Sequence, residues 1–280
     1  MRGLVISPEY EITNDGGIHI KNSDIDATKL RQYLLYWDKL DFPDNNLIGI
    51  GGSPEIDYLK DVGVLQRSRH ILKSISGDVG DFYSKIQLET LKNNNEKEKG
   101  KWSLAQPNSK LVLNEESSVL TRNLEVELYE SLPVPTSDVS LDDVLIFKER
   151  RKDELLEFRH LMDNLYLEIL DSGDFERARL KNIDQLQLKI IELDRVMSES
   201  RITRLLQNVK IELDYTQVFI NTVGAAVAGN AFGFPVGLSG ALGFASSFIK
   251  VSSEFSLKPK NIPEGLKDYA YLYYSKKELI

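Results

Sequence analysis

The sequence predicts an α+β or α/β N-terminal domain, residues 1–136, followed by an all-α domain, residues 137–280, with coiled-coil-like helices. Short apolar runs alternate with amphipathic stretches in the first part, which is typical of strands and helices packed in layers. Residues 141–214 contain no proline and one glycine, and apolar side chains recur there every three or four positions. A Gly/Ala-rich stretch, residues 215–250, follows, and we expect a helical hairpin there.

The composition limits the classes of function. A chain of 280 residues with 41% apolar and 28% charged residues is typical of a globular protein. The absence of cysteine excludes disulfides, Cys-ligated zinc and iron–sulfur clusters. The net charge of −8 disfavours nucleic acid as a partner. Because the N-terminus lacks the long apolar stretch of a signal peptide, we expect a cytoplasmic protein.

The first part of the chain contains signals for two strands, two helices and a hairpin. Gly3–Ile6 is an apolar run that predicts a buried strand, and Asn14–Gly17 is a turn signal before the alternating residues 18–20. Asp24 or Asp26 is placed to cap a helix whose apolar face runs from Leu30 to Leu40. Leu47–Ile50 predicts the next strand, and Ser53 followed by proline predicts a short helix ending near Gly63.

The remaining elements of this part are a strand at 69–72, a helix at about 78–91, and strands at 111–113 and 124–128. The second of these last two strands is predicted by strict alternation of apolar and charged residues. Asn93–Lys101 is polar and low in complexity, so we expect a mobile loop there.

In the helical part, Ser140 has the position of a helix cap, and two apolar stripes follow. The segment Asp171–Asp174 separates the stripes and predicts a tight turn between antiparallel helices. Residues 201–213 then form a third helix or extend the second. The stripes are Leu155, Phe158, Met162, Leu165 and Ile169, and Ile183, Leu186, Ile190, Leu193 and Met197.

No charged side chain occurs from Tyr215 to Ile249. Gly229, Gly233 and Gly237 recur every four residues, a spacing that lets helix backbones approach closely. Pro235 divides the stretch into arms at 218–229 and 236–249, each about 20 Å long and shorter than a ~30 Å bilayer core. We therefore expect a buried helical hairpin. A self-association surface is the second alternative, and membrane insertion is the third.

An aromatic segment, residues 266–280, ends the chain. The run Tyr269–Tyr274 is rich in β-formers and predicts a strand that returns to the sheet or covers a helix. Aromatic side chains of this kind also stack on nucleic-acid bases.

Gly49, Gly51, Gly52 and Ser53 form a candidate phosphate-binding loop, because they lie between a predicted strand and a predicted helix. No Gly-Lys-Ser/Thr follows, and Pro54 occupies the last position of a dinucleotide fingerprint. A plain strand-to-helix turn explains the same residues.

We expect no catalytic residue, metal or cofactor. The three histidines lie in separate contexts, and Lys148–Lys152 is interpreted as a solvated helix face. Acidic residues that could serve a magnesium-dependent nuclease are more simply helix caps or surface groups; they are Asp24, Asp26, Asp38, Asp41, Asp57 and Asp61.

Residues 34–40, 145–148 and 155–159 resemble an uncharacterised family of bacterial proteins, as does the aromatic run near the C-terminus. The resemblance covers most of the chain and implies an α/β-like part, a charged helical middle and a Gly/Ala-rich stretch. It implies no established activity, and points to mobile or phage-defence gene neighbourhoods.

From these observations we expect a non-enzymatic protein-interaction or assembly component, which contacts another protein or itself through the helical domain. Two alternatives stay open. One is a membrane-disrupting effector that uses residues 218–249. The other is a metal-dependent nuclease or nucleotide-binding enzyme in the N-terminal domain.

Overall fold

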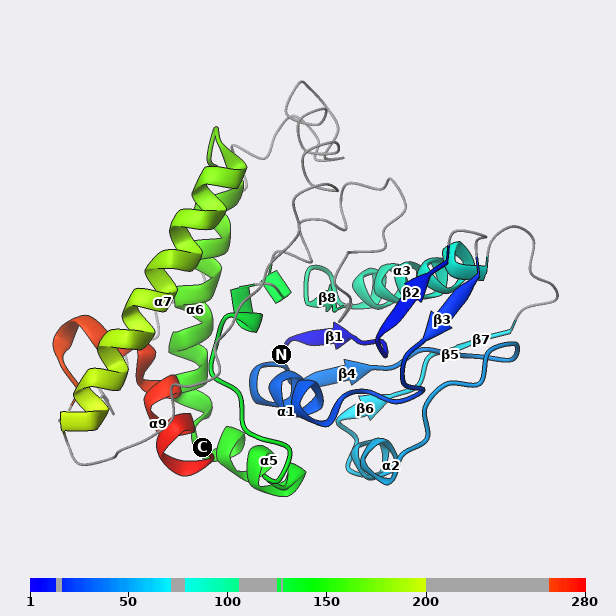
Figure 1. Ribbon diagram of the computed structural model, residues 1–280, viewed down its shortest axis with the longest axis horizontal. Coiled ribbons are helices and arrows are strands. Elements are labelled where there is room, and N and C mark those ends of the chain that lie inside the picture. The colour runs from blue at the N-terminus through cyan, green and yellow to red at the C-terminus, as the bar shows by residue number, and fades with distance from the viewer. Residues whose placement is uncertain (14–16, 72–78, 106–124, 127, 200–261) are drawn as a thin grey trace.

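The structure is a computed structural model that describes residues 1–13, 17–71, 79–105, 125–126, 128–199 and 262–280. A small α/β part lies beside a group of helices (Figure 1). The mixed α/β class predicted from the sequence is therefore confirmed. The segments 111–113 and 201–261, with Gly229, Gly233 and Gly237, lie outside the described residues, as do residues 14–16 of the predicted turn.

The central sheet is parallel and has the strand order β6-β4-β1-β8. Leu4 pairs with Leu40 on one side and with Ser103 on the other. The chain proceeds outward from β1 to β4 and β6, and then adds β8 on the opposite side of β1, as in doubly wound folds. The strands are β1 (Gly3–Val5), β4 (Lys39–Asp41), β6 (Leu65–Gln66) and β8 (Trp102–Leu104).

Two small strand pairs accompany this sheet. Strands β5 (Asp44–Asn45) and β7 (Arg69–His70) pair in parallel just beyond the ends of β4 and β6. Strands β2 (Tyr10–Ile12) and β3 (Ile18–Ile20) pair antiparallel on either side of the predicted turn, so the hairpin is confirmed.

Three helices connect these strands. α1 (Ala27–Tyr36) is capped by Asp26, whose carboxylate accepts from the N–H groups of Thr28 and Lys29. α2 (Pro54–Asp61) is capped by Ser53, as predicted, and lies beside β6. α3 (Val79–Lys97) packs on β8 and β1 at the other side of the sheet (Figure 1).

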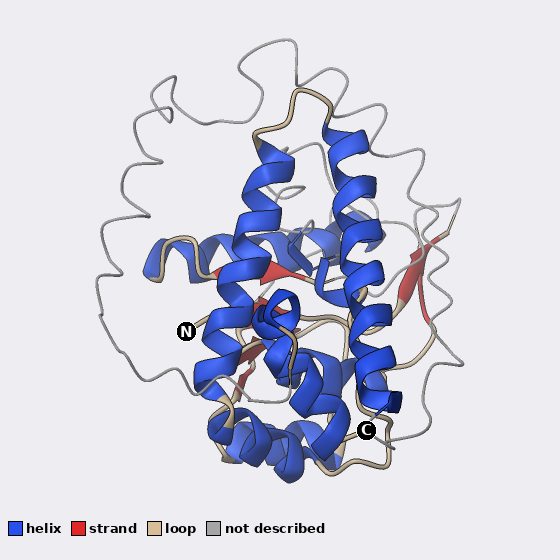
Figure 2. Cartoon of the chain, turned by 90° about the vertical axis from the view of Figure 1, so that its left-hand side faces the viewer, coloured by secondary structure: helices blue, strands red, loops and turns tan. Residues whose placement is uncertain are grey.

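The helical part is built around two long helices that stand side by side (Figure 2). The predicted turn between them is present, and the described members of both apolar stripes are buried. A short 3-10 helix and the last α-helix pack against α6. The elements are α5 (Leu141–Arg150), α6 (Lys152–Leu170), α7 (Phe175–Glu199), η2 (Glu264–Tyr269) and α9 (Ala270–Glu278).

One continuous apolar core joins both parts of the chain. It includes Leu4 and Leu40 of the sheet together with Phe158 of α6 and Tyr271 of α9. The Tyr36 ring of α1 lies within 6.3 Å of the Phe158 ring and 6.2 Å of the Tyr271 ring, between centroids. The domain boundary at residue 136 stays a prediction.

Two predicted elements between residues 37 and 50 are wrong. The helix ends at Tyr36, and Leu40 lies in β4, where it pairs with Leu4 and Leu65. Residues 47–50 are not a strand. The side-chain oxygen of Asn45 accepts from the backbone N–H groups of Leu47 and Ile48, at 2.9 and 2.7 Å. Because this turn uses both N–H groups, they are not available for hydrogen bonds to a neighbouring strand.

The polar run that begins at Asn93 was expected to be a loop, but residues 93–97 continue α3. Tertiary hydrogen bonds account for this. The Asn94 amide donates to Asp41, and Asn95 exchanges two hydrogen bonds with the backbone of Trp102, at 3.0 and 3.1 Å. Asparagine is a poor helix former in isolation, so contacts with the sheet decide its conformation here.

Two segments predicted as strands are helical instead. In the first, residues 125–126 and 128–130 are helical, and the Tyr129 ring packs on Trp37 with centroids 4.8 Å apart. In the second, residues 264–278 form η2 and α9. Ala270–Tyr273 are all buried, because neighbours cover this short helix on several sides. Aromatic residues favour strands only where a pleated surface is available to them.

Candidate functional site

The candidate phosphate-binding loop lies before α2, as expected. Gly51 and Gly52 have positive φ angles of 77° and 140°. The Ser53 hydroxyl accepts from the N–H group of Ile56, its carbonyl accepts from Asp57, and Pro54 has no N–H to offer. Phosphate binding by Gly49, Gly51, Gly52 and Ser53 stays a prediction.

Close packing gives Gly51 a structural role. The Arg67 guanidinium lies over the Phe42 ring, 4.2 Å from its centroid, and donates to the Ile50 carbonyl at 2.7 Å. A Cβ atom on Gly51 would lie 2.5 Å from the Phe42 ring and 3.0 Å from Arg67. Gly51 is therefore required by the packing of this turn.

A buried carboxylate lies at the carboxyl end of β4, the edge where parallel sheets commonly bind ligands. Asp41 is fully buried. One oxygen accepts from the Ser68 N–H group at 3.1 Å, and the other accepts from Gln66, the Ser68 hydroxyl and Asn94 at 2.7, 2.7 and 2.8 Å. Four donors fill the acceptor capacity of a carboxylate, so Asp41 holds β4, β6 and α3 together.

We predict that Asp41→Asn lowers the free energy of unfolding by about 1–2 kcal/mol, because an amide NH₂ group then faces donors where an oxygen had accepted. Urea unfolding measures the change. Asp61→Asn, at an exposed position on α2, is the control and should stay within about 0.5 kcal/mol of the parent protein. Equal stabilities of the two variants would contradict the role given to Asp41.

His70 and Thr90 form the one close histidine–hydroxyl pair that we find in the described residues, with His70 Nε2 2.7 Å from Thr90 Oγ1. The Thr90 hydroxyl donates its proton to the Ile86 carbonyl at 2.8 Å. His70 Nε2 must therefore carry a hydrogen and donate to Thr90. This arrangement is the reverse of a base that activates a nucleophile.

The acidic residues considered for a metal site are separated in the fold. Asp26 caps α1, Asp38 pairs with Arg159, Asp41 binds four donors and Asp57 pairs with Lys60. Within the ranges that the structure describes, we find no group of three or more His, Asp or Glu residues placed to hold a metal ion.

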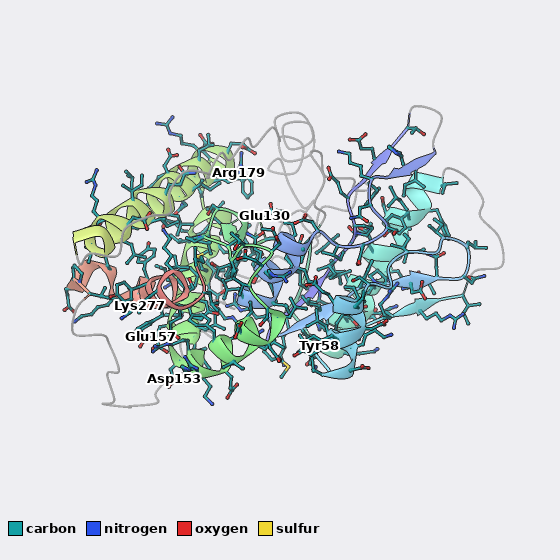
Figure 3. The ribbon with its side chains drawn as sticks, turned by 60° about the horizontal axis from the view of Figure 1, so that its bottom comes forward. Tyr58, Glu130, Asp153, Glu157, Arg179 and Lys277 are labelled. Atoms are coloured by element: carbon teal, nitrogen blue, oxygen red, sulfur yellow. The ribbon has the colours of Figure 1, made fainter. Side chains whose placement is uncertain are left out.

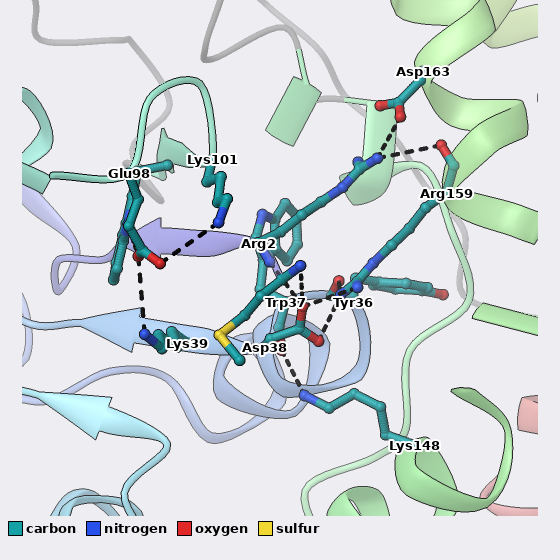
Figure 4. A network of polar contacts seen from close by, with 12 residues as sticks. Arg2, Tyr36, Trp37, Asp38, Lys39, Glu98, Lys101, Lys148, Arg159 and Asp163 are labelled. Carbon is teal, nitrogen blue, oxygen red and sulfur yellow. Dashed lines mark hydrogen bonds and ion pairs between the residues drawn. The ribbon is translucent and has the colours of Figure 1, made fainter. Parts of the chain in front are cut away.

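The opposite edge of the sheet carries a network of charged groups that joins the two parts of the chain (Figure 4). Arg159 of α6, 8% exposed, donates to both carboxylate oxygens of Asp38 at 3.0 Å and to the Tyr36 carbonyl at 2.6 Å. The backbone N–H of Arg2 also donates to Asp38, at 2.7 Å. Burial raises the pKa of Asp38, but the hydrogen bonds and charge of Arg159 outweigh burial and hold that pKa below its ordinary value.

The Arg2 side chain extends this network to the helical part. Its guanidinium pairs with Glu125 at 3.0 Å and with Asp163 of α6 at 2.5 Å. Residues from the start of the chain, from the segment before α5 and from α6 therefore meet at one point. Arg2 and Glu125 are mostly shielded from water, whereas Asp163 is about half exposed, so removal of Arg2 leaves the Glu125 charge costly to bury.

Side chains from two other helices, α5 and α9, bind carbonyl groups at the end of α1. Lys148 of α5 donates to the carbonyls of Leu34 and Trp37 at 2.8 and 2.5 Å. The Tyr271 hydroxyl of α9 donates to the Leu35 carbonyl at 2.7 Å. The last carbonyls of a helix lack partners within the helix, and a cation is favourable there. The polar contacts thus fix α5 and α9 on α1.

Lys148 gives a pH-dependent prediction. Burial lowers the pKa of Lys148 to about 8, although the charge of Asp38 acts in the opposite direction. The unfolded chain, with a lysine pKa of 10.5, binds more protons than the folded chain between pH 8 and 10.5. The contribution of Lys148 to the free energy of unfolding is therefore expected to rise as the pH increases through this window.

The measurement is urea unfolding of the parent protein and of Lys148→Met between pH 7 and about 9.5. The difference in unfolding free energy between them should change little near pH 7 and should increase above pH 8. The same tyrosines are present in both proteins, so their ionisation cancels. A difference that falls with pH would show that folding stabilises the charged form of Lys148.

The network corrects two expectations about individual residues. Lys148 was interpreted as part of a solvated helix face, but its ammonium group is buried against α1, whereas Lys152 is exposed and pairs with Glu149. The sequence predicts that Asp38 is a helix cap or surface group, but its carboxylate is partly buried and binds Arg159. A charged residue next to the apolar stripe of α6 was the available signal for Arg159, but the sequence does not show its partner.

The exposed faces of α6 and α7 carry large aliphatic side chains. Leu156 and Leu167 lie eleven residues, or about three turns, apart on α6, and Leu180 and Ile191 have the same spacing on α7. Leu188 is 66% exposed. Each set lies opposite the buried stripe of its helix.

Comparison with known proteins adds one match. A family model described as a family of unknown function, DUF6236, matches residues 13–280. The chain belongs to the DUF6236 family. This match confirms the resemblance to an uncharacterised family. Neither the curated proteins nor the solved structures gave a match.

The residues that match DUF6236 include both sides of the charged network. Asp38, Lys148 and Arg159 all lie within the match, whereas Arg2 precedes it. The α/β part and the helical part of this DUF6236 protein are thus matched together, in agreement with the continuous apolar core.

Proposed function

We propose that this DUF6236 protein is a non-enzymatic protein-interaction or assembly component that makes its contacts through the helical part. The observation that carries the proposal is the distribution of exposed apolar side chains. Five of the ten large exposed hydrophobic residues in the described ranges lie on α6 and α7, namely Leu156, Leu167, Leu180, Leu188 and Ile191. Exposed apolar side chains gathered on one element are typical of interaction surfaces.

The buried polar groups support the same proposal. The carboxylates of Asp41 and Asp38 and the ammonium of Lys148 bind groups of the protein itself. These contacts hold strands and helices in place, which is a folding role. These three chemistry-bearing side chains therefore find structural partners within the protein.

The proposal includes the finer architecture predicted for the helical part. The α6–α7 pair packs in a coiled-coil-like manner, and residues 215–250 form a hairpin whose Gly229, Gly233 and Gly237 permit close packing of backbones. The recurrence of these glycines every four residues in the sequence supports this arrangement.

The alternative functions are left without a specific observation in their favour. None of the helices that the structure describes has the length and apolar character needed to cross a bilayer, and residues 218–249 lie outside the described ranges. The metal-dependent alternative would require a cluster of ligands, and Asp26, Asp38, Asp41 and Asp57 have the separate partners given above.

A photo-crosslinking experiment in cells tests the proposal. A photoreactive residue replaces Leu188 in the full chain, and a second variant carries it at Ile71, which is 79% exposed but lies outside the helical part. We expect discrete protein adducts from position 188 and none in common with position 71. Absence of adducts at position 188, or identical adducts from both positions, would contradict the proposal.

A further inference from the structure

We draw no further inference here: the strongest candidate, the outer surface of α6 and α7 with its exposed leucines and the acids Asp153 and Glu157 (Figure 3), supports none, because each set of leucines lies opposite the stripe by which its helix packs and nothing within the described ranges shows what covers it.

Discussion

Arg159→Met is expected to lower the free energy of unfolding by about 3–5 kcal/mol, because it leaves the Asp38 carboxylate without its main counter-charge in a partly buried site. The substitution also removes the donor to the Tyr36 carbonyl at the end of α1. Arg159 links α6 to the sheet and to α1, so its loss should also reduce cooperativity between the two parts. Urea unfolding followed by tryptophan fluorescence and by circular dichroism measures both effects.

Arg177→Met is the matched control, since Arg177 is an exposed arginine on the neighbouring helix α7. Its effect should stay within about 0.5 kcal/mol. The destabilisation caused by loss of Arg159 should also diminish in acid, because the pKa of Asp38 is depressed in the folded state and its stabilisation disappears as the pH falls through that lowered pKa. Similar stabilities for the two variants would show that the network contributes little.

Gly3→Val is expected to destabilise the protein by about 3 kcal/mol or more, because the centre of the sheet has no room for a side chain at this position. A Cβ atom on Gly3 would lie 2.4–2.5 Å from three ring carbons of Trp102 on the adjacent strand β8. Trp102 is 3% exposed, and its indole N–H donates to Glu98 at 3.0 Å, so the ring has little freedom to move. Thermal and urea unfolding measure the loss.

Gly173→Val, in the turn between α6 and α7, is the control, since nothing lies within 4 Å of the corresponding Cβ position. We expect a change of about 0.5 kcal/mol or less. If Gly3→Val were as stable as this control, Trp102 would have to occupy another position than the one observed. A Trp102→Ala exchange in the Gly3→Val background would then reveal whether the two sites interact.

The long amphipathic helices were predictable because their signal repeats. Each stripe has five apolar residues at helical spacing, and burial of that stripe is enough to fix the helix and its orientation. Caps at Asp26, Ser53 and Ser140 were also predictable, since a cap is a local contact within three residues.

Short strands and polar runs were predicted less well. Leu40 fits the apolar face of the preceding helix in sequence, yet it lies in β4, because pairing with Leu4 outweighs its helical preference. Tyr269–Tyr274 has strong β propensity, but it packs as a helix in a site enclosed by α6 and α1. Segments this short take their structure from their surroundings.

The candidate sites show the same division. The residue types at Asp38, Lys148 and Arg159 were visible in the sequence, but their partners are more than a hundred positions away. Sequence analysis therefore predicts that an isolated acid or lysine is a surface group, and only the folded structure shows what it binds.

The sequence by itself determined the mixed α/β class, the two long helices with their turn, the caps and the membership of an uncharacterised family. These features depend on periodicity, local hydrogen bonds and overall similarity to a family, which follow from the order of residues along the chain. Only the tertiary structure decided the strand order, the helical form of the last residues, the network around Asp38 and the exposed leucines of α6 and α7. Those features depend on contacts between distant residues, whose energies are set by burial and hydrogen-bond geometry that exist only once the chain has folded.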